Sequence, residues 1–382
     1  MKFQILLMSL LLNCSFVFGQ WQSLNGPNDL DIYSVGANGS TIFAGTNGDG
    51  LYVSYDDGQT WSLAADIPDY HYIHSIVKSD QNIFAGQYRS TDNGISWVIM
   101  ENGFLPCCVT SIASSGSKVF AGAYNYKGVR TSDDYGQTWV APANDLLSHN
   151  EVYAVAINGN NLFAGTRTNG VFLSTDNGAN WDTINNGLTS MDIRYLTVCG
   201  TNIFASTYNG RFLSADNGAN WVNVNNGLSH YPGAVASYGG NLIAVDSLRV
   251  FVSYDLGQSW ISVNEGLESK IVYSVAIDEP YIYVGTISSG VWRRPLSEVG
   301  LTENTKNTDF NIFPNPAIDN ITIQSQKKGA MLSIYNLQGQ LLLSQQIQQE
   351  KTELNINNLV AGVYILKLVY KDKTEGIKLV KE

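Results

Sequence analysis

An eight-residue motif that recurs six times constrains the fold of this chain more than any other feature of its 382 residues. The motif reads Ser-x-Asp-x-Gly-x-(Thr/Ser/Asn)-Trp, and its copies occupy residues 54–61, 90–97, 132–139, 174–181, 214–221 and 253–260. Counted from Trp21, the tryptophans of this series are 40, 36, 42, 42, 40 and 39 residues apart. Repetition with such a period indicates that one structural unit is copied along the chain.

Each unit contains four short segments with the composition of β-strands. In the fourth unit these are residues 152–157, 161–166, 171–175 and 181–186, which are separated by turns rich in Gly and Asn. Four such strands form one antiparallel sheet, and a period near forty residues is typical of a β-propeller, in which each sheet is one blade. No helical periodicity is found in residues 20–299.

The number of blades follows from the inner strands, which are predicted to begin near Tyr33, His74, Thr110, Tyr153, Arg194, Gly233 and Tyr273. The last unit has a third strand at 290–295 but lacks the motif and an outer strand, whereas Trp21 begins what looks like an outer strand without a blade. We therefore expect residues 20–25 to join the seventh sheet and close the ring, which removes an exposed sheet edge. The predicted fold class is all-β, with a seven-bladed β-propeller over residues 20–299.

The aspartate of the motif is predicted to have a structural role. Asp side chains accept hydrogen bonds from backbone N–H groups two residues further on and so close a turn. The glycine at the fifth position allows a positive φ, and the tryptophan buries a large ring beside the outer strand. Calcium binding is disfavoured because the other ligand positions and the closing Glu of an EF-hand loop are missing. The six structural aspartates are Asp56, Asp92, Asp134, Asp176, Asp216 and Asp255.

The chain changes character near residue 300. Residues 20–309 hold 13 Lys and Arg against 27 Asp and Glu, a net charge of −14, whereas residues 310–382 hold 8 against 6 and carry +2. The polar stretch 300–309 is predicted to be a linker, and the short alternating strands of residues 310–382 predict a small Ig-like β-sandwich. The acidic body argues against nucleic acid or an anionic membrane as the partner.

Residues 1–19 have the composition of an export signal peptide. Lys2 is followed by the apolar run 5–12, and small or modest residues precede a predicted cleavage site before Gln20. The apolar run is too short to span a bilayer, and no other segment has the length of a transmembrane helix.

An exported protein can form disulfides, so the cysteines of the mature chain need an interpretation. Cys107 and Cys108 are adjacent, and Cys199 is expected two blades away. The sequence leaves open whether any pair is bonded, and small buried apolar side chains are the simpler interpretation.

With these residues in view, the six motifs resemble the Asp-box, or BNR, repeats of the sialidase-like propeller superfamily. The resemblance covers residues 20 to about 299 and implies the propeller fold. It does not select a function, because the superfamily includes sialidases, sortilin-type receptors, xyloglucan-hydrolysing enzymes and photosystem assembly factors.

Residues 310–382 resemble the type A sorting domain of the type IX secretion system of Bacteroidetes. The features that carry the resemblance are Pro314-Asn315-Pro316, Asp319, the turn at 334–340, the run at 359–367 and the terminal Lys-Leu-Val-Lys-Glu. The resemblance implies that the type IX machinery is a partner of this segment. It also implies that the propeller is secreted or attached to the exterior of the outer membrane.

Aromatic and imidazole side chains gather in the segments that join one blade to the next. In a propeller these segments share a face with the loops between second and third strands, and ligands usually bind there over the central channel. Tyrosine and histidine rings suit stacking against a carbohydrate or a peptide, although tyrosines could equally pack between the blades. The candidate ligand-binding residues are His74, His149, Tyr153, Arg167, Arg194, Tyr195 and Tyr231.

Blades four and five also carry two candidates for catalysis. Glu151 and Asp192 occupy equivalent positions, with Arg167 and Arg194 nearby. Two carboxylates beside Arg and Tyr could perform acid/base chemistry on a glycosidic bond, or they could form surface ion pairs of little energetic value. A sialidase is disfavoured, because the three substrate-binding arginines and the early Arg-Ile-Pro motif of those enzymes are missing.

These observations favour a secreted or cell-surface, noncatalytic propeller that binds a glycan or a protein. We expect no cofactor, no metal, no nucleic acid and no transmembrane segment. The alternatives are a glycoside hydrolase at the mouth of blades four and five, and an assembly or scaffold factor.

Overall fold

The computed structural model describes residues 20–104, 109–124, 128–143, 146–147, 150–229, 232–301, 310–314, 317–336, 340–360, 362–370 and 373–381. The predicted signal peptide, Cys107, Cys108 and most of the predicted linker lie outside the described residues. Cys199 is buried and has a free thiol.

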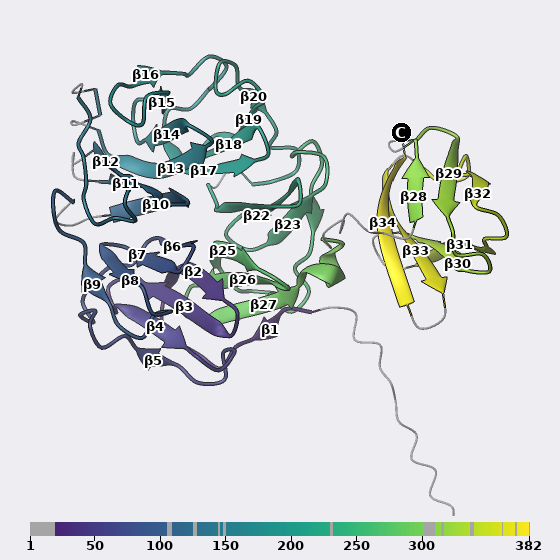
Figure 1. The fold of residues 1–382 in the computed structure, drawn as a ribbon, viewed down its shortest axis with the longest axis horizontal. Helices are drawn as coiled ribbons and strands as arrows, with labels where there is room; N and C mark the ends of the chain where they lie inside the picture. Colours follow the sequence, from purple (N-terminus) through teal and green to yellow (C-terminus); the bar gives the residue numbers. More distant parts are fainter. Residues whose placement is uncertain are drawn as a thin grey trace, which may run out of the picture.

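The described strands from β1 to β27 form seven sheets, which Figure 1 shows as a ring around a central axis. Blade one consists of β2 (Ile32–Asn38), β3 (Thr41–Thr46), β4 (Leu51–Ser54) and β5 (Ser62–Leu63). Blade two consists of β6 (Ile76–Ser79), β7 (Asn82–Ala85), β8 (Tyr88–Ser90) and β9 (Val98–Ile99). Blade three consists of β10 (Val109–Ser115), β11 (Lys118–Ala123) and β12 (Gly128–Ser132). Blade four consists of β13 (Val152–Asn158), β14 (Asn161–Thr166), β15 (Val171–Ser174) and β16 (Asp182–Thr183). Blade five consists of β17 (Ile193–Cys199), β18 (Asn202–Thr207), β19 (Gly210–Ser214) and β20 (Val222–Asn223). Blade six consists of β21 (Val235–Tyr238), β22 (Asn241–Val245), β23 (Val250–Ser253) and β24 (Ile261–Ser262). Blade seven consists of β25 (Val272–Asp278), β26 (Tyr281–Thr286) and β27 (Val291–Pro295), and β1 (Gln22–Ser23) is its fourth strand.

The second strand of every blade is buried along nearly its whole length. β3 is buried along its whole length, whereas the outer strand β5 of the same sheet is exposed. A strand that neighbouring sheets cover on both faces needs apolar residues on both faces, so it reads as a continuous apolar run. The core therefore consists of clusters between adjacent blades, such as the one that Phe43 and Trp97 share.

Several strand boundaries differ from the predicted ones. The outer strand predicted over 181–186 is only Asp182–Thr183, because the chain then turns and Leu188 N donates to Asn185 O at 3.0 Å. The inner strands of blades two and six begin two residues after His74 and Gly233, at Ile76 and Val235. A single-turn 3₁₀ helix, η1 (Leu296–Val299), follows β27 without a sequence signal.

The start of the described chain completes the seventh sheet. β1 pairs antiparallel with β27, with Gln22 opposite Arg293. Trp21 is 3% exposed, its backbone N donates to Glu265 O at 2.9 Å, and its indole Nε1 donates to Val263 O at 2.6 Å. The closure predicted from the unpaired Trp21 is confirmed.

The motif tryptophan of blade five makes the same two contacts with blade four. Trp221 N donates to Asn186 O at 2.9 Å, and its Nε1 donates to Ile184 O at 2.7 Å. Trp21 therefore occupies in blade seven the place that a motif tryptophan occupies elsewhere.

The motif turn is closed by a pair of side chains. Asp56 Oδ1 accepts from Thr60 N at 2.8 Å and Oδ2 from the Thr60 hydroxyl at 2.6 Å, while Ser54 Oγ donates to Asp56 and accepts from Gly58 N at 2.9 Å. The backbone donor to the carboxylate thus lies four residues on, not two as the sequence argument assumed. The serine bonds and the backbone bond recur at Asp92, Asp134, Asp176, Asp216 and Asp255. The second side-chain donor is a hydroxyl group at Asp92, Asp134 and Asp255, and it is the amide of Asn180 or Asn220 at Asp176 and Asp216.

The different offset has a backbone cause. Both the fourth and the fifth motif residues have positive φ, 62° at Asp57 and 85° at Gly58, so the turn is longer than a simple Asp turn. The fifth position also needs glycine for space, since a Cβ on Gly94 would lie 2.4 Å from a ring carbon of Phe43. The fourth position accepts even Tyr135 at φ 57°.

Residues 310–381, where described, form two further sheets. One contains β28 (Phe310–Phe313), β29 (Asn320–Ser325) and β32 (Lys351–Asn355); the other contains β31 (Leu341–Gln346), β30 (Met331–Tyr335), β33 (Gly362–Tyr370) and β34 (Lys373–Lys381). One apolar cluster, with Ile323 from the first sheet and Leu366 from the second, lies between them.

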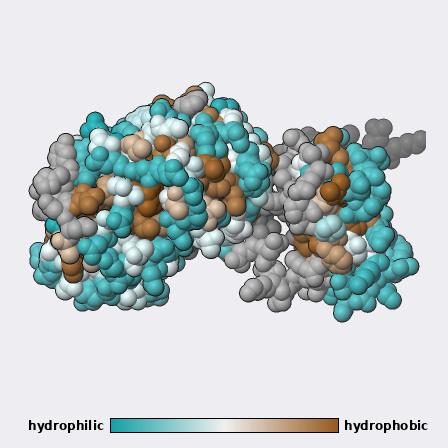
Figure 2. Space-filling model, turned by 90° about the horizontal axis from the view of Figure 1, so that it is seen from above, coloured by the Kyte–Doolittle hydropathy of each residue, from teal (hydrophilic) through white to brown (hydrophobic). Residues whose placement is uncertain are grey.

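Figure 2 shows a surface that is largely hydrophilic in this view, with the hydrophobic side chains in separate patches.

Candidate functional site

A cavity of about 270 Å³ opens where the inner strands of all seven blades begin. It is lined by Tyr33, His74, Thr110, Tyr124, Tyr153, Arg194, Tyr195, Tyr208, Pro232 and Tyr273. Six of these are the residues predicted to begin the inner strands; in blade six the lining residue is Pro232 instead of Gly233. We call this cavity the channel mouth.

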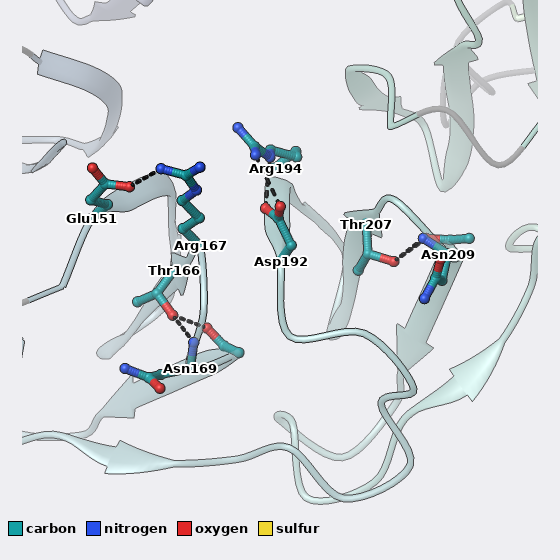
Figure 3. A network of polar contacts seen from close by, with 10 residues as sticks. Glu151, Thr166, Arg167, Asn169, Asp192, Arg194, Thr207 and Asn209 are labelled. Carbon is teal, nitrogen blue, oxygen red and sulfur yellow. Dashed lines mark hydrogen bonds and ion pairs between the residues drawn. The ribbon is translucent and has the colours of Figure 1, made fainter.

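The two kinds of loop around the channel mouth are hydrogen-bonded to one another. Gly50 N, between β3 and β4, donates to His71 O at 3.1 Å, and Arg167 N, after β14, donates to Glu151 O at 3.0 Å. The Arg167 loop is also held by Asn169 N, which donates to Thr166 Oγ1 (Figure 3). The blade-joining segments and the loops between second and third strands therefore share one face.

One side of the channel mouth is aromatic. The rings of Tyr33 and Tyr273 lie 4.1 Å apart at 35°, and His74 is stacked on Tyr33 at 5.3 Å. Tyr72, 58% exposed, meets His74 edge-on at the rim. Burial lowers the pKa of His74 below its ordinary value of 6.5, so the imidazole is neutral at neutral pH. This side offers flat apolar faces with polar edges.

The opposite side is built around Arg194. Its Nε lies 2.6 Å from Asp192 Oδ1, and its Nη2 donates to Asp192 Oδ2 at 2.9 Å. The guanidinium carbon lies 4.3 Å from the ring centre of Tyr153 and 4.9 Å from that of Tyr208. Burial alone would lower the pKa of Arg194, but Asp192 more than reverses this effect and raises it. Arg194 is thus a fixed cation whose charge Asp192 balances.

The second candidate carboxylate has its own arginine. Glu151 Oε2 lies 2.9 Å from Arg167 Nη1, and its hydrogen bond raises the pKa of Arg167. Figure 3 shows the Glu151–Arg167 and Asp192–Arg194 pairs on neighbouring blades, each carboxylate pointing toward its own arginine. Both candidate carboxylates are therefore held in ion pairs.

The candidate residues divide into three groups. His74, Tyr153, Arg194 and Tyr195 line the channel mouth, and Arg167 lies beside it with Glu151. His149 and Tyr231 lie outside the described residues.

Sequence reasoning did not select several lining residues as binding candidates. Tyr33 and Tyr273 occupy the same repeat position as Tyr153, and Tyr124 and Tyr208 directly follow their second strands, as Arg167 does. The alignment of the inner strands already contains Tyr33 and Tyr273, and aligning the residues that follow the second strands would have found Tyr124 and Tyr208. Within the part of the chain that the structure describes, no group of three or more His, Cys, Asp or Glu is placed to hold a metal ion.

Comparison with known families finds one matching segment in each part of the chain. Residues 311–382 match the secretion system C-terminal sorting domain, and residues 52–63 match the BNR/Asp-box repeat. The chain is an Asp-box β-propeller with a sorting tail. The tail marks a protein that the type IX secretion system exports to the cell surface, and it implies contact with that machinery. No helix among the described residues is long and apolar enough to cross a membrane.

Solved structures share the propeller fold. YCF48 from Cyanidioschyzon merolae is 13% identical, with 72% of this chain and 98% of that chain covered and a TM-score of 0.57. YCF48 bound to D1 peptide is 15% identical, with 77% and 98% covered and a TM-score of 0.56. At such identities the likeness concerns the fold alone.

One curated protein is similar over a short stretch. Funoran endo-beta-hydrolase from Wenyingzhuangia aestuarii is 36% identical over 86 residues, which make up 22% of this chain. The matched stretch spans only 12% of the length of that relative.

Proposed function

We propose that this exported surface propeller binds a glycan or a peptide at the channel mouth and does not transform it. The observation that carries the proposal is the lining: each of the seven blades contributes a residue to one cavity, and six of the ten lining residues are tyrosines. Tyrosines offer large, rigid contact faces at low entropic cost, which is the property of binding surfaces.

The charges of the mouth favour a ligand part that is uncharged. Arg194 and Arg167 are each paired with a carboxylate, so neither presents an unbalanced charge to a ligand. His74 is neutral at neutral pH. Because both arginines are balanced and the surrounding body is acidic, the mouth has no net attraction for an anion.

The pairing of the carboxylates supports a noncatalytic role. A glycosidase needs one carboxyl group that donates a proton and another that attacks or activates water. In this site Glu151 and Asp192 each face a guanidinium across less than 3 Å, at 2.9 and 2.6 Å. Hydrolysis remains the second candidate function, which the similarity to the funoran hydrolase motivates.

The ligand is a glycan or a peptide. The solved structure of YCF48 bound to D1 peptide motivates the peptide arm, because that protein has the same fold. The rings of Tyr33 and Tyr273, which lie 4.1 Å apart at an angle of 35°, motivate the glycan arm, because sugar rings stack on aromatic faces.

The test is a binding panel with the mature chain, residues 20–382, against neutral oligosaccharides and against peptides. Tyr153→Ala removes a lining ring and the platform under Arg194, and we expect it to weaken binding by at least about fivefold. The matched control is Tyr55→Ala, since Tyr55 is 47% exposed in the motif turn of blade one, outside the mouth. Equal binding by both variants would refute the site, and release of products by the wild type would favour hydrolysis.

A further inference from the structure

One buried position breaks the pattern of the repeat. The third-strand residue three positions before the motif serine is glutamine (Gln87) in blade two and arginine (Arg211) in blade five. In the other blades the equivalent residue is apolar: Leu51, Val129, Val171, Val250 and, at the same register in blade seven, Val291. Arg211 is 2% exposed, although burying a charge is expensive unless it is paired and hydrogen-bonded. A repeat that tolerates an apolar residue here needs no arginine for its fold.

The neighbouring positions depart from the repeat as well. Opposite Arg211 in the ladder stands Ser206, where blades one, three, four and seven have glycine. Directly after β22 stands Asp246, which is 3% exposed. These departures all lie between blades five and six, beside the lining residues Tyr195 and Pro232.

Arg211 and Asp246 hold one backbone segment from two sides. Arg211 Nη1 donates to Ser229 O at 3.2 Å, and its Nη2 donates to Val245 O at 2.6 Å. Asp246 Oδ2 accepts from Ser229 N at 3.2 Å. The carbonyl and the amide of Ser229, three residues before the lining residue Pro232, are therefore both bound by buried charged groups.

Four buried polar atoms of this cluster have no hydrogen-bond partner among the described residues: Ser206 Oγ, Arg211 Nε, Ser229 Oγ and Asp246 Oδ1. They comprise one obligate donor, one obligate acceptor and two hydroxyls. Buried groups of this kind are satisfied by interior water, which both donates and accepts.

We propose that Arg211, Ser229 and Asp246, with enclosed ordered water, form an interior clasp that positions the blade-six edge of the channel mouth. The clasp binds water between Arg211 Nε and Asp246 Oδ1, and Arg211 is a positioning residue that acts on the mouth through Ser229. The inference rests on the proposed function in one respect, since it takes the channel mouth as the binding site. Its two tests, however, need no ligand.

The first test is a high-resolution crystal structure of the mature chain. The clasp requires an ordered water within hydrogen-bond distance of Arg211 Nε and of Asp246 Oδ1. Direct packing of protein atoms against both groups, with no water, would overturn the proposal.

The second test is amide hydrogen exchange with residue resolution. In Arg211→Val combined with Ser206→Gly, which introduces the Gly–Val pair of blades three, four and seven, we expect the Ser229 amide to exchange at least about tenfold faster, with little change in the strands. Arg211→Lys keeps the positive charge but lacks the separate guanidinium nitrogens that donate to two carbonyls, and it serves as a second variant if the first folds poorly. The matched control is Arg249→Met, because Arg249 also contacts Asp246 Oδ2, at 3.4 Å, but from an exposed position.

Each outcome of the exchange experiment decides the matter. Faster exchange confined to the segment before Pro232 supports the clasp. Unchanged exchange at Ser229, or a uniform acceleration over all strands of blade five, would show that Arg211 positions nothing locally. A panel that yields no ligand would leave these readouts intact, so failure of the binding proposal and failure of the clasp are distinguishable.

Discussion

Ring closure by Trp21 is the structural claim with the largest predicted effect on stability. The indole is 3% exposed, and its two hydrogen bonds reach Glu265 O and Val263 O in blade six. Replacing a buried tryptophan by alanine costs about 3–5 kcal/mol. At about 2–4 °C per kcal/mol, Trp21→Ala should lower the melting temperature of the propeller by about 6–20 °C.

Tryptophan fluorescence is a selective assay for this effect, because all eight tryptophans precede residue 293 and the sorting tail contains none. The control is Gln22→Ala, an exposed change at the adjacent residue that should alter the stability by no more than about 0.5 kcal/mol. Deleting residues 20–26 should destabilise the propeller at least as much as Trp21→Ala. If Trp21→Ala melts together with the control, β1 does not close the ring in solution.

Three further predictions follow from the same structure. Removing residues 310–382 should leave the propeller folded but absent from the cell surface, which fractionation of the host would show; normal display of the truncated chain would refute the role of the tail. Glu151→Gln and Asp192→Asn should abolish no hydrolytic activity on a polysaccharide panel; turnover by the wild type that either change removes would restore the hydrolase alternative. Hydrogen bonds from Thr60 hold the pKa of Asp56 at about 2, below its ordinary 3.8, so the stabilisation is complete above pH 3.8 and is lost as the pH falls through about 2. The melting temperatures of wild type and Asp56→Ala should therefore converge over that range, and a constant difference would contradict this assignment.

The regular features of the fold could be predicted from the sequence because they repeat. The motif spacing indicated one sheet per unit, and the solitary Trp21 indicated where the missing outer strand comes from. The inner-strand starts were correct within two residues, with the largest errors at His74 and Gly233. Outer strands were overestimated, because the pattern of 181–186 does not reveal that Leu188 N already turns back to Asn185 O.

The channel mouth was predicted less completely, because its contacts depend on how blades face one another. The repeat position of Tyr153 identified the ring of inner-strand residues, yet the contact between the rings of Tyr33 and Tyr273 joins residues far apart in the chain. The sequence did not decide whether Asp192 forms an ion pair with Arg194, because a spacing of two residues permits this contact without requiring it. The burial of Arg211 was not predicted, although its departure from the repeat was visible in the sequence.

The position of a bound ligand tests the central claim most directly. The experiment is a crystal structure of the mature chain with the tightest binder from the oligosaccharide and peptide panel. We expect density in the channel mouth, in contact with Tyr153, Arg194 and the Tyr33–Tyr273 pair. Density on the outer rim of the blades or on the sorting tail, with the mouth holding only solvent, would contradict it.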